Sequence, residues 1–389
     1  MAIRNVLVYL VLFGLLVGCS TATLTDVPSS PSPPPPTEAA DEGDFIDHAF
    51  LSPESQVVFQ GGEFQPLELA PILMTGFGEA EYIEWQVGPT EHLALESEDG
   101  QLMAEPLDPD WIGQESIDLT ACNTQEEYCT RGQVDYGVLD PNQPTIIHVQ
   151  NDGYLIVAGG KKILIDGLFV LGTNPPSSQR LQAMQEALPP FDDLDLILVT
   201  HDHADHFEPD LVGQHLLNDT GAVVVTTDVT AEYLASWFED ANQFEERVIG
   251  LHLEPGQTQT IEAAGIELEV YYFSHGNPTM PNFGFLFTVE GITFFHTGDI
   301  VVDDVPLEEV QQFGLFERGI DIGFLPHFYL WQDEYEGYME AAFGVEFIIP
   351  MHVDLTAALT PRTVMEMVAE ADNMFFFETE MSWWVIDLP

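Results

Sequence analysis

The chain has 389 residues, of which 45% are hydrophobic, so it is long enough for two or more domains and too apolar to be disordered. Its 66 acidic and 8 basic residues give a formal net charge of −58 at pH 7. A field of that sign repels nucleic acid, so we expect no nucleic-acid partner. The acidic surface is typical of a protein that works in high salt or at low pH. The alternative is a surface that binds a specific cationic partner.

Residues 1–18 have the composition of an export signal. Arg4 stands in a short leading region and is followed by an apolar stretch too short for a stable transmembrane span. Its end, LVGC at 16–19, resembles the bacterial lipobox. That resemblance implies cleavage before Cys19 and lipid attachment there, with the exported protein anchored in the lipid bilayer at the outer face of a bacterial membrane. The alternative is an ordinary signal peptide with an incidental cysteine.

Residues 19–45 are rich in Ser, Thr and Pro without apolar periodicity, which predicts an extended tether. Over 46–143, short apolar runs such as QVVFQ and SIDLTAC alternate with turn signals, which predicts a small all-β sandwich. The segment DWIGQESIDLTACN resembles the late strands of bacterial immunoglobulin-like modules. In an exported chain, Cys122 and Cys129 favour a local disulfide, and the alternative is two buried thiols.

From residue 144 to residue 389, strand-like runs alternate with amphipathic helical stretches such as SSQRLQAMQEAL. This alternation predicts an α/β domain in which helices enclose two sheets. The run LDLILV is followed at 200–207 by THDHADHF, a dense cluster of side chains that bind metals. Three later apolar runs also end in such a side chain. The candidate ligands are His201, His203, Asp205, His206, His275, Asp299 and His352.

Strand ends at one edge of a sheet converge on a shared cleft, and imidazole with carboxylate suits zinc and similar divalent ions. One such histidine would more often be an ordinary hydrogen-bonded residue. The dense cluster together with three separate strand ends indicates a metal centre.

These motifs resemble the metallo-β-lactamase superfamily of metal-dependent hydrolases over roughly residues 144–389. HxHxDH at 201–206 matches its signature, ILIDG with Asp166 precedes it, and SHGN, HTGD and IPMH follow in order. The resemblance implies a four-layer αββα sandwich, with Asp166 in a structural role. The chain looks most like the broad hydrolase branch that includes lactonase-like enzymes.

The resemblance also implies two divalent metal ions, and zinc is the metal that we expect. One ion would take His201, His203 and His275, the other Asp205, His206 and His352, with Asp299 bridging both. A hydroxide shared by the ions would attack an ester, lactone or phosphoester of a small molecule. Asp205 could also take the proton of that water.

Two further histidines are candidates for the catalytic site. His296 would hold a ligand in orientation, or else face a neighbouring strand. His327, with Tyr329 and Trp331, would shape the substrate pocket, or else belong to an aromatic loop packed on the core.

Departures from other branches narrow the function. Zinc β-lactamases often carry cysteine at the position of Asp299 or lack the bridging acid, which argues against antibiotic hydrolysis. The iron-containing reductases of this fold carry glutamate at the position of His203, which argues against a redox di-iron centre. Single-iron persulfide dioxygenases remain an open alternative.

Two other classes of function also remain open. One is a surface binding or adhesion lipoprotein whose β-sandwich binds a cell-wall polymer. The other is a lipoprotein that stores or senses metal. The sequence indicates no oligomeric state.

Overall fold

The computed structural model describes residues 51–52, 55–60, 66–67, 70–71, 83–98, 101–123, 128–171, 176, 178–276, 280–331, 335 and 337–353, followed by 364, 366, 368–369, 371, 373–377 and 379–387. They belong to one compact unit, Asp44–Pro389. The predicted signal peptide (1–18), the tether (19–45) and Cys19 lie outside the described residues. Among the described residues, no helix is both long and apolar enough to cross a bilayer.

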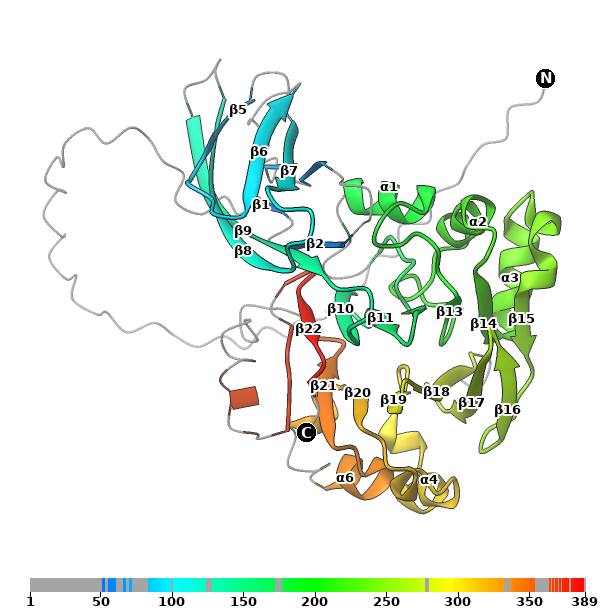
Figure 1. The fold of residues 1–389 in the computed structure, drawn as a ribbon. Coiled ribbons are helices and arrows are strands. Elements are labelled where there is room, and N and C mark those ends of the chain that lie inside the picture. The colour runs from blue at the N-terminus through cyan, green and yellow to red at the C-terminus, as the bar shows by residue number, and fades with distance from the viewer. Residues whose placement is uncertain are drawn as a thin grey trace, which may run out of the picture. The chain divides into compact units, whose positions relative to one another are not determined.

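The first nine strands form two larger sheets and one two-stranded sheet, drawn in blue to cyan in Figure 1. The order is β2-β9-β8-β5 in one sheet and β3-β7-β6 in the other, while β1 pairs with β4. Their bounds are β1 Leu51–Ser52, β2 Ser55–Phe59, β3 Pro66–Leu67, β4 Ala70–Pro71, β5 Ile83–Val87, β6 Leu93–Glu98, β7 Gln101–Pro106, β8 Gly113–Asn123 and β9 Tyr128–Leu139.

Buried side chains from both sheets, among them Leu102, Ile117 and Val134, share one core, as the sheets of a sandwich do. Cys122 on β8 lies opposite Cys129 on β9, and the two form a disulfide, which confirms the predicted pairing. The immunoglobulin-like classification of residues 46–143 stays a prediction.

The rest of the chain builds two larger sheets. The seven-stranded sheet has the order β15-β14-β13-β12-β11-β10-β22, and the six-stranded sheet has β16-β17-β18-β19-β20-β21. The first comprises β10 Thr145–Gln150, β11 Gly153–Ala158, β12 Lys161–Ile165, β13 Leu196–Leu198, β14 Val223–Thr227, β15 Val248–Leu251 and β22 Trp383–Val385. The second comprises β16 Thr258–Ala263, β17 Ile266–Phe273, β18 Asn282–Val289, β19 Ile292–His296, β20 Ile322–Pro326 and β21 Phe347–Met351.

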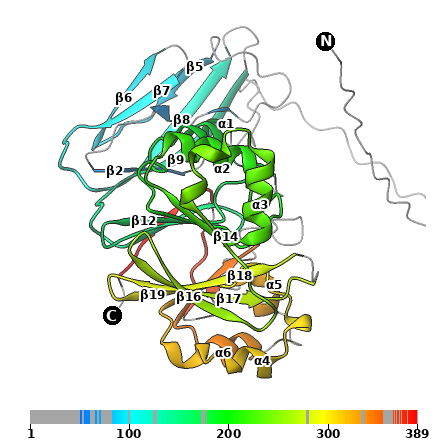
Figure 2. The ribbon, with the colours of Figure 1, turned by 90° about the vertical axis from the view of Figure 1, so that its right-hand side faces the viewer.

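Helices cover the outer face of each sheet. Figure 2 shows α1, α2 and α3 on one side of the paired sheets and α4 and α6 on the other. The helices are α1 Ser178–Glu186, α2 Pro209–Asn218, α3 Asp228–Trp237, α4 Leu307–Gln312, α5 His327–Leu330 and α6 Tyr338–Phe343.

Three buried clusters hold these layers together. One lies between the sheets and includes Ile156, Leu198 and Phe285. A second joins the first sheet to its helices, and a third joins the second sheet to α4 and α6. Strands covered on both faces must be apolar throughout, and the buried run LIL of β13 is an example. The predicted layered α/β architecture is confirmed.

Strand direction brings the candidate ligands to one edge. β12, β13, β14 and β15 are mutually parallel, so their carboxyl ends lie together. In the second sheet, β17 and β19 are each antiparallel to β18 and therefore share a direction, and β19, β20 and β21 are parallel. β10 and β12 are each antiparallel to β11, so the turn after β10 lies at the same edge as the carboxyl end of β12.

The core between the sheets makes a direct prediction. Phe285 is fully buried there, so Phe285→Ala leaves a cavity and should lower the free energy of unfolding by about 3–5 kcal/mol. Phe316 is 52% exposed, and Phe316→Ala should change it by less than about 1 kcal/mol. Denaturant unfolding of both variants measures the difference. Equal losses would contradict this placement of the core.

Candidate metal centre

The HxHxDH motif forms a tight loop at the end of β13. Within it, the backbone N–H groups of His206 and Phe207 both donate to the carbonyl of His203, at 3.0 and 2.9 Å. The carbonyl of Thr200 accepts from the N–H of Phe283 at the start of β18. The loop is therefore compact and tied to the second sheet.

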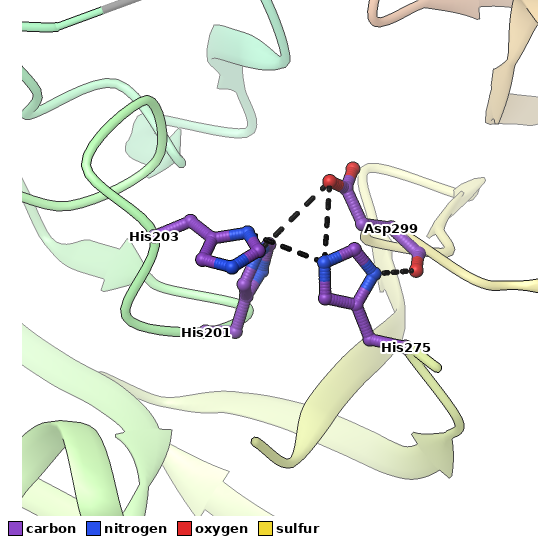
Figure 3. Close-up of side chains that lie close together, drawn as sticks. All are labelled: His201, His203, His275 and Asp299. Atoms are coloured by element: carbon purple, nitrogen blue, oxygen red, sulfur yellow. Dashed lines mark hydrogen bonds and ion pairs between the residues drawn. The ribbon is translucent and has the colours of Figure 1, made fainter. Parts of the chain in front are cut away.

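A first group of ligating atoms comes from His201, His203, His275 and Asp299, all within 4.8 Å of one another. Nε2 of His201 and Nε2 of His275 lie 2.9 and 3.2 Å from Nδ1 of His203. Oδ2 of Asp299 lies 3.9 Å from Nε2 of His201 and from Nε2 of His275. Figure 3 shows the three rings and this carboxylate turned toward one another.

A second group of the same extent comprises Asp152, His206, Asp299 and His352. Oδ2 of Asp299 lies 3.3 Å from Nε2 of His206 and 3.4 Å from Nε2 of His352. Oδ2 of Asp152 lies 3.5 Å from Nε2 of His206. Asp299 is therefore shared by both groups, so two ions held there would be neighbours.

The backbone of Asp299 is held by a residue at the start of β18. Its N–H donates to Oδ1 of Asn282 at 3.0 Å, and Nδ2 of Asn282 donates to the carbonyl of Thr297. Gly298 before it has φ 56°, and a Cβ there would lie 2.2 Å from Oδ1 of Asn282. The turn that presents Asp299 therefore requires glycine.

Hydrogen bonds fix which ring nitrogen faces the centre. Nδ1 of His275 lies 2.6 Å from the carbonyl of Asp299, which only accepts, so Nδ1 carries the proton. Nδ1 of His206 donates to Oδ2 of Asp166 at 2.9 Å. When these rings are neutral, Nε2 is the nitrogen that keeps the lone pair for a metal.

Asp166 is the buried residue on which two ligands depend. It accepts from N and Oγ1 of Thr200, at 2.8 and 2.7 Å, as well as from His206. Because the Thr200 hydroxyl donates to Asp166, it accepts from Nδ1 of His201, 2.9 Å away. In the neutral ring, Nε2 of His201 is then also the nitrogen that carries the free lone pair. Asp166 thus has the structural role that the resemblance implied.

The residues present fit a bound cation. Oδ1 and Oδ2 of Asp152, Nε2 of His206 and Oδ1 of Asp299 are buried without a hydrogen-bond partner in the described part of the chain. Such atoms each cost about 1–3 kcal/mol unless something satisfies them. Nitrogen and carboxylate ligands suit zinc and similar divalent ions.

The charges of the second group reinforce this interpretation. Burial would lower the pKa of His352, but the carboxylates of Asp152 and Asp299 raise it to about 10. Burial would likewise lower the pKa of His206, but Asp299 and Asp166 raise it well above its usual value. Without a metal, these imidazoles take up protons as the positive charge that the carboxylates require.

The other expected site residues lie around these groups. Asp205 stands beside the second group with its side chain 30% exposed, and Nδ2 of Asn151 donates to its carbonyl and to Oδ2. Its carboxylate oxygens lie 3.7 Å from Nε2 of His352 and 3.9 Å from Nε2 of His206. Asp205 is not one of the four residues of either group.

His296 is buried and joins two ligand-bearing loops. Its Nδ1 accepts from the N–H of Gly298 at 3.0 Å, so the proton is on Nε2, which donates to the carbonyl of Asp152 at 3.3 Å. His327 begins α5, with Nδ1 lying 3.3 Å from the carbonyl of Met351. Its ring contacts Phe328, which in turn contacts His352.

Sequence reasoning missed Asp152 and Asn282. Asp152 lies in the turn NDG between two strands, where aspartate is ordinary turn chemistry. The sequence could have indicated Asp152 through the hairpin of β10 and β11, because their antiparallel pairing places this turn at the metal edge. Asn282 lies outside the ligand motifs, and it contributes through the hydrogen bond that it accepts from the N–H of Asp299, 17 residues later in the chain.

Histidines and aspartates gathered at one edge of the sheets of an α/β sandwich are typical of a metal-dependent enzyme. A sequence model of the β-lactamase superfamily domain matches residues 161–370, more than half of the chain. The chain belongs to this superfamily.

Curated relatives agree with that assignment. A metal-dependent hydrolase of Pyrococcus furiosus is 31% identical over 202 residues, covering 51% of this chain and 77% of the relative. A metal-dependent hydrolase of Pyrococcus horikoshii is 28% identical over 210 residues, covering 50% of this chain and 79% of the relative. At the level of enzyme class, the prediction of a metal-dependent hydrolase is confirmed.

Similar solved structures include a possible metal-dependent hydrolase from Veillonella parvula, with 16% identity and a TM-score of 0.46. Another is a metallo hydrolase from Ignicoccus hospitalis, with 15% identity and a TM-score of 0.44. Each alignment covers 63% of this chain and all of the other chain.

The role of Asp166 can be tested by Asp166→Asn. The amide would face the His206 ring with a donor, which favours the tautomer that cannot bind metal. Zinc affinity, measured by competition with a chelator, should fall between about tenfold and a hundredfold. Asp202→Asn removes the same charge from the nearby motif loop and should leave the affinity unchanged. Equal affinities for both variants would exclude this role.

Metal binding should also depend on pH. His206 and His352 have raised pKa values in the metal-free protein, so both are protonated at neutral pH and must lose protons to bind metal. Affinity should therefore rise with pH and fall, by about tenfold per unit for each displaced proton, as the solution is acidified. Adding zinc at pH 7 in weak buffer should release protons, and no release would contradict the assignment.

Proposed function

We propose that the protein is an extracytoplasmic, lipid-anchored hydrolase with a dinuclear zinc centre that cleaves an ester, lactone or phosphoester of a small molecule. The observation that carries this proposal is the sharing of Asp299 by two ligand groups, each with at least two imidazoles. Export and lipidation are supported by the signal-like residues 1–18 and by LVGC at 16–19.

Divalent ions bound in these groups would supply Lewis acidity toward the substrate and lower the pKa of water. The chain's own residues do the rest. Thr200, Asp166 and the Asp299 carbonyl engage Nδ1 of His201, His206 and His275 respectively, so each ring is already oriented with Nε2 as the nitrogen left for a metal. This preorganisation removes the free-energy cost of orienting the rings during the reaction.

Asp205 is the group best placed to move a proton. Its carboxylate stands beside His352 and His206, and it is partly exposed where the buried Asp299 is not. It can accept a proton at Oδ1 or Oδ2 from water entering the site and return it to a leaving group. His327 and Phe328 stand next to His352, where they would form part of the substrate pocket.

The distribution of charge favours a neutral acyl substrate within this range. All five basic side chains that the structure describes are engaged with partners outside the metal centre: Lys161 with Asp195, Lys162 with Asp192, Arg180 with Glu380, Arg247 with backbone carbonyls and Arg318 with Glu269. Meanwhile Asp202, Asp205 and Glu208 add negative charge in and beside the motif loop. A phosphate monoester would meet repulsion there, whereas an ester or lactone would not.

Metal content and turnover test the proposal together. The wild-type protein should hold two zinc ions per chain by mass spectrometry and hydrolyse a neutral p-nitrophenyl ester or a lactone faster than p-nitrophenyl phosphate. Asp299→Ala removes the shared ligand and should lower both metal content and activity, the latter by at least about a hundredfold. Full activity of this variant, or wild-type protein that binds no metal, would overturn the proposal.

A further inference from the structure

Asp152 is a buried carboxylate that nothing in the described protein satisfies. Its side chain has no solvent exposure, and neither oxygen has a hydrogen-bond partner among the described residues. Its Oδ2 lies 3.5 Å from Nε2 of His206. A carboxylate in such a place is unfavourable unless a cation joins it.

The spacing of the surrounding atoms is that of a coordination shell. Ligands about 2.0–2.1 Å from a tetrahedral metal are separated from one another by about 3.3–3.4 Å. Around Nε2 of His206, Oδ2 of Asp299 lies at 3.3 Å and Oδ2 of Asp152 at 3.5 Å. Asp205 is farther from the same nitrogen, at 3.9 Å, and it is partly exposed.

The backbone around Asp152 holds its carboxylate in this place. Its carbonyl accepts from Nε2 of His296, whose other nitrogen is bound to the loop that carries Asp299. A Cβ on Gly153 would lie 3.1 Å from the carbonyl oxygen of Asp166, so the turn after β10 packs directly against the end of β12. The preceding residue, Asn151, donates instead to Asp205. The two carboxylates are thus held separately.

We propose that Asp152 is a direct ligand of the second metal ion, a role that the motif resemblance gave to Asp205. The inference rests on the proposed dinuclear centre. The second site then consists of Asp152, His206, His352 and the shared Asp299, while the first has three imidazoles and Asp299. Asp205 remains at the mouth of the site as an uncoordinated carboxylate, free to exchange protons.

The competing explanation is an ion pair without metal. A doubly protonated His206 would donate a hydrogen bond from Nδ1 to Asp166 and direct its second N–H, at Nε2, toward Asp152. The distance of 3.5 Å is long for a charge-assisted hydrogen bond, which is usually about 2.7–2.9 Å. The two explanations differ in what happens when Asp152 loses its charge.

Asp152→Asn and Asp205→Asn in the full-length protein form a matched pair, since each removes one carboxylate beside the same two imidazoles. After equilibration with zinc and removal of excess, we expect two ions per chain in the wild type and in Asp205→Asn, and one in Asp152→Asn. Zinc titration should show the weaker site of Asp152→Asn loosened by more than about a hundredfold. An Asp152→Asn variant that keeps two tightly held ions would overturn the inference.

Thermal unfolding in the presence of a chelator separates a ligand from a structural residue. Metal-free Asp152→Asn should unfold at about the same temperature as metal-free wild type, because the amide keeps the shape of the carboxylate, and neither oxygen of Asp152 has a hydrogen-bond partner to lose among the described residues. Zinc should then raise the unfolding temperature of the wild type more than that of the variant. A metal-free variant that unfolds earlier would assign Asp152 to an ion pair instead. A wild type that binds no zinc at all would overturn the proposed function, an outcome distinct from either.

Discussion

The carboxylate of Asp299 is the constraint around which the metal edge of this protein is organised. It is nearly buried, it is shared by two groups of imidazoles, and one of its oxygens has no hydrogen-bond partner within the described part of the chain. A buried negative charge must be compensated, and the ends of β13, β17 and β21 supply histidines that accept either protons or a metal ion. The two sheets must therefore converge at Asp299, because the histidines that compensate its charge come from strand ends of both sheets.

A second layer of interactions converts that requirement into a defined site. Asp166, Thr200 and the carbonyl of Asp299 each accept a hydrogen bond from Nδ1 of one ring, which leaves the opposite nitrogen to face the centre. His296 joins the turn of Asp152 to the loop of Asp299 through its two nitrogens. These contacts come from both sheets, so the geometry of the centre depends on the sheets packing correctly, and the large aromatic core between them serves that end.

Membership of the β-lactamase superfamily describes the class of chemistry without naming the substrate. The distinguishing features of this chain are its acidity, the engagement of its described basic residues away from the centre, and the carboxylate of Asp152 beside the second group. Together they describe a centre that is strongly negative without its metals. Such a centre favours cations as cofactors.

The sequence by itself determined the layered α/β class and the edge at which ligands gather. Hydrophobic runs are local signals, and a histidine directly after such a run, as at His201 or His352, lies at a strand end whatever the rest of the chain does. Only the tertiary structure decided which carboxylates face the ligating nitrogens. Asp152 comes within reach of the centre through the hairpin of β10 and β11, and it meets His296, 144 residues away, through pairing that no local pattern encodes. The tautomers of the histidines were decided in the same way, because their partners come from separate loops and strands.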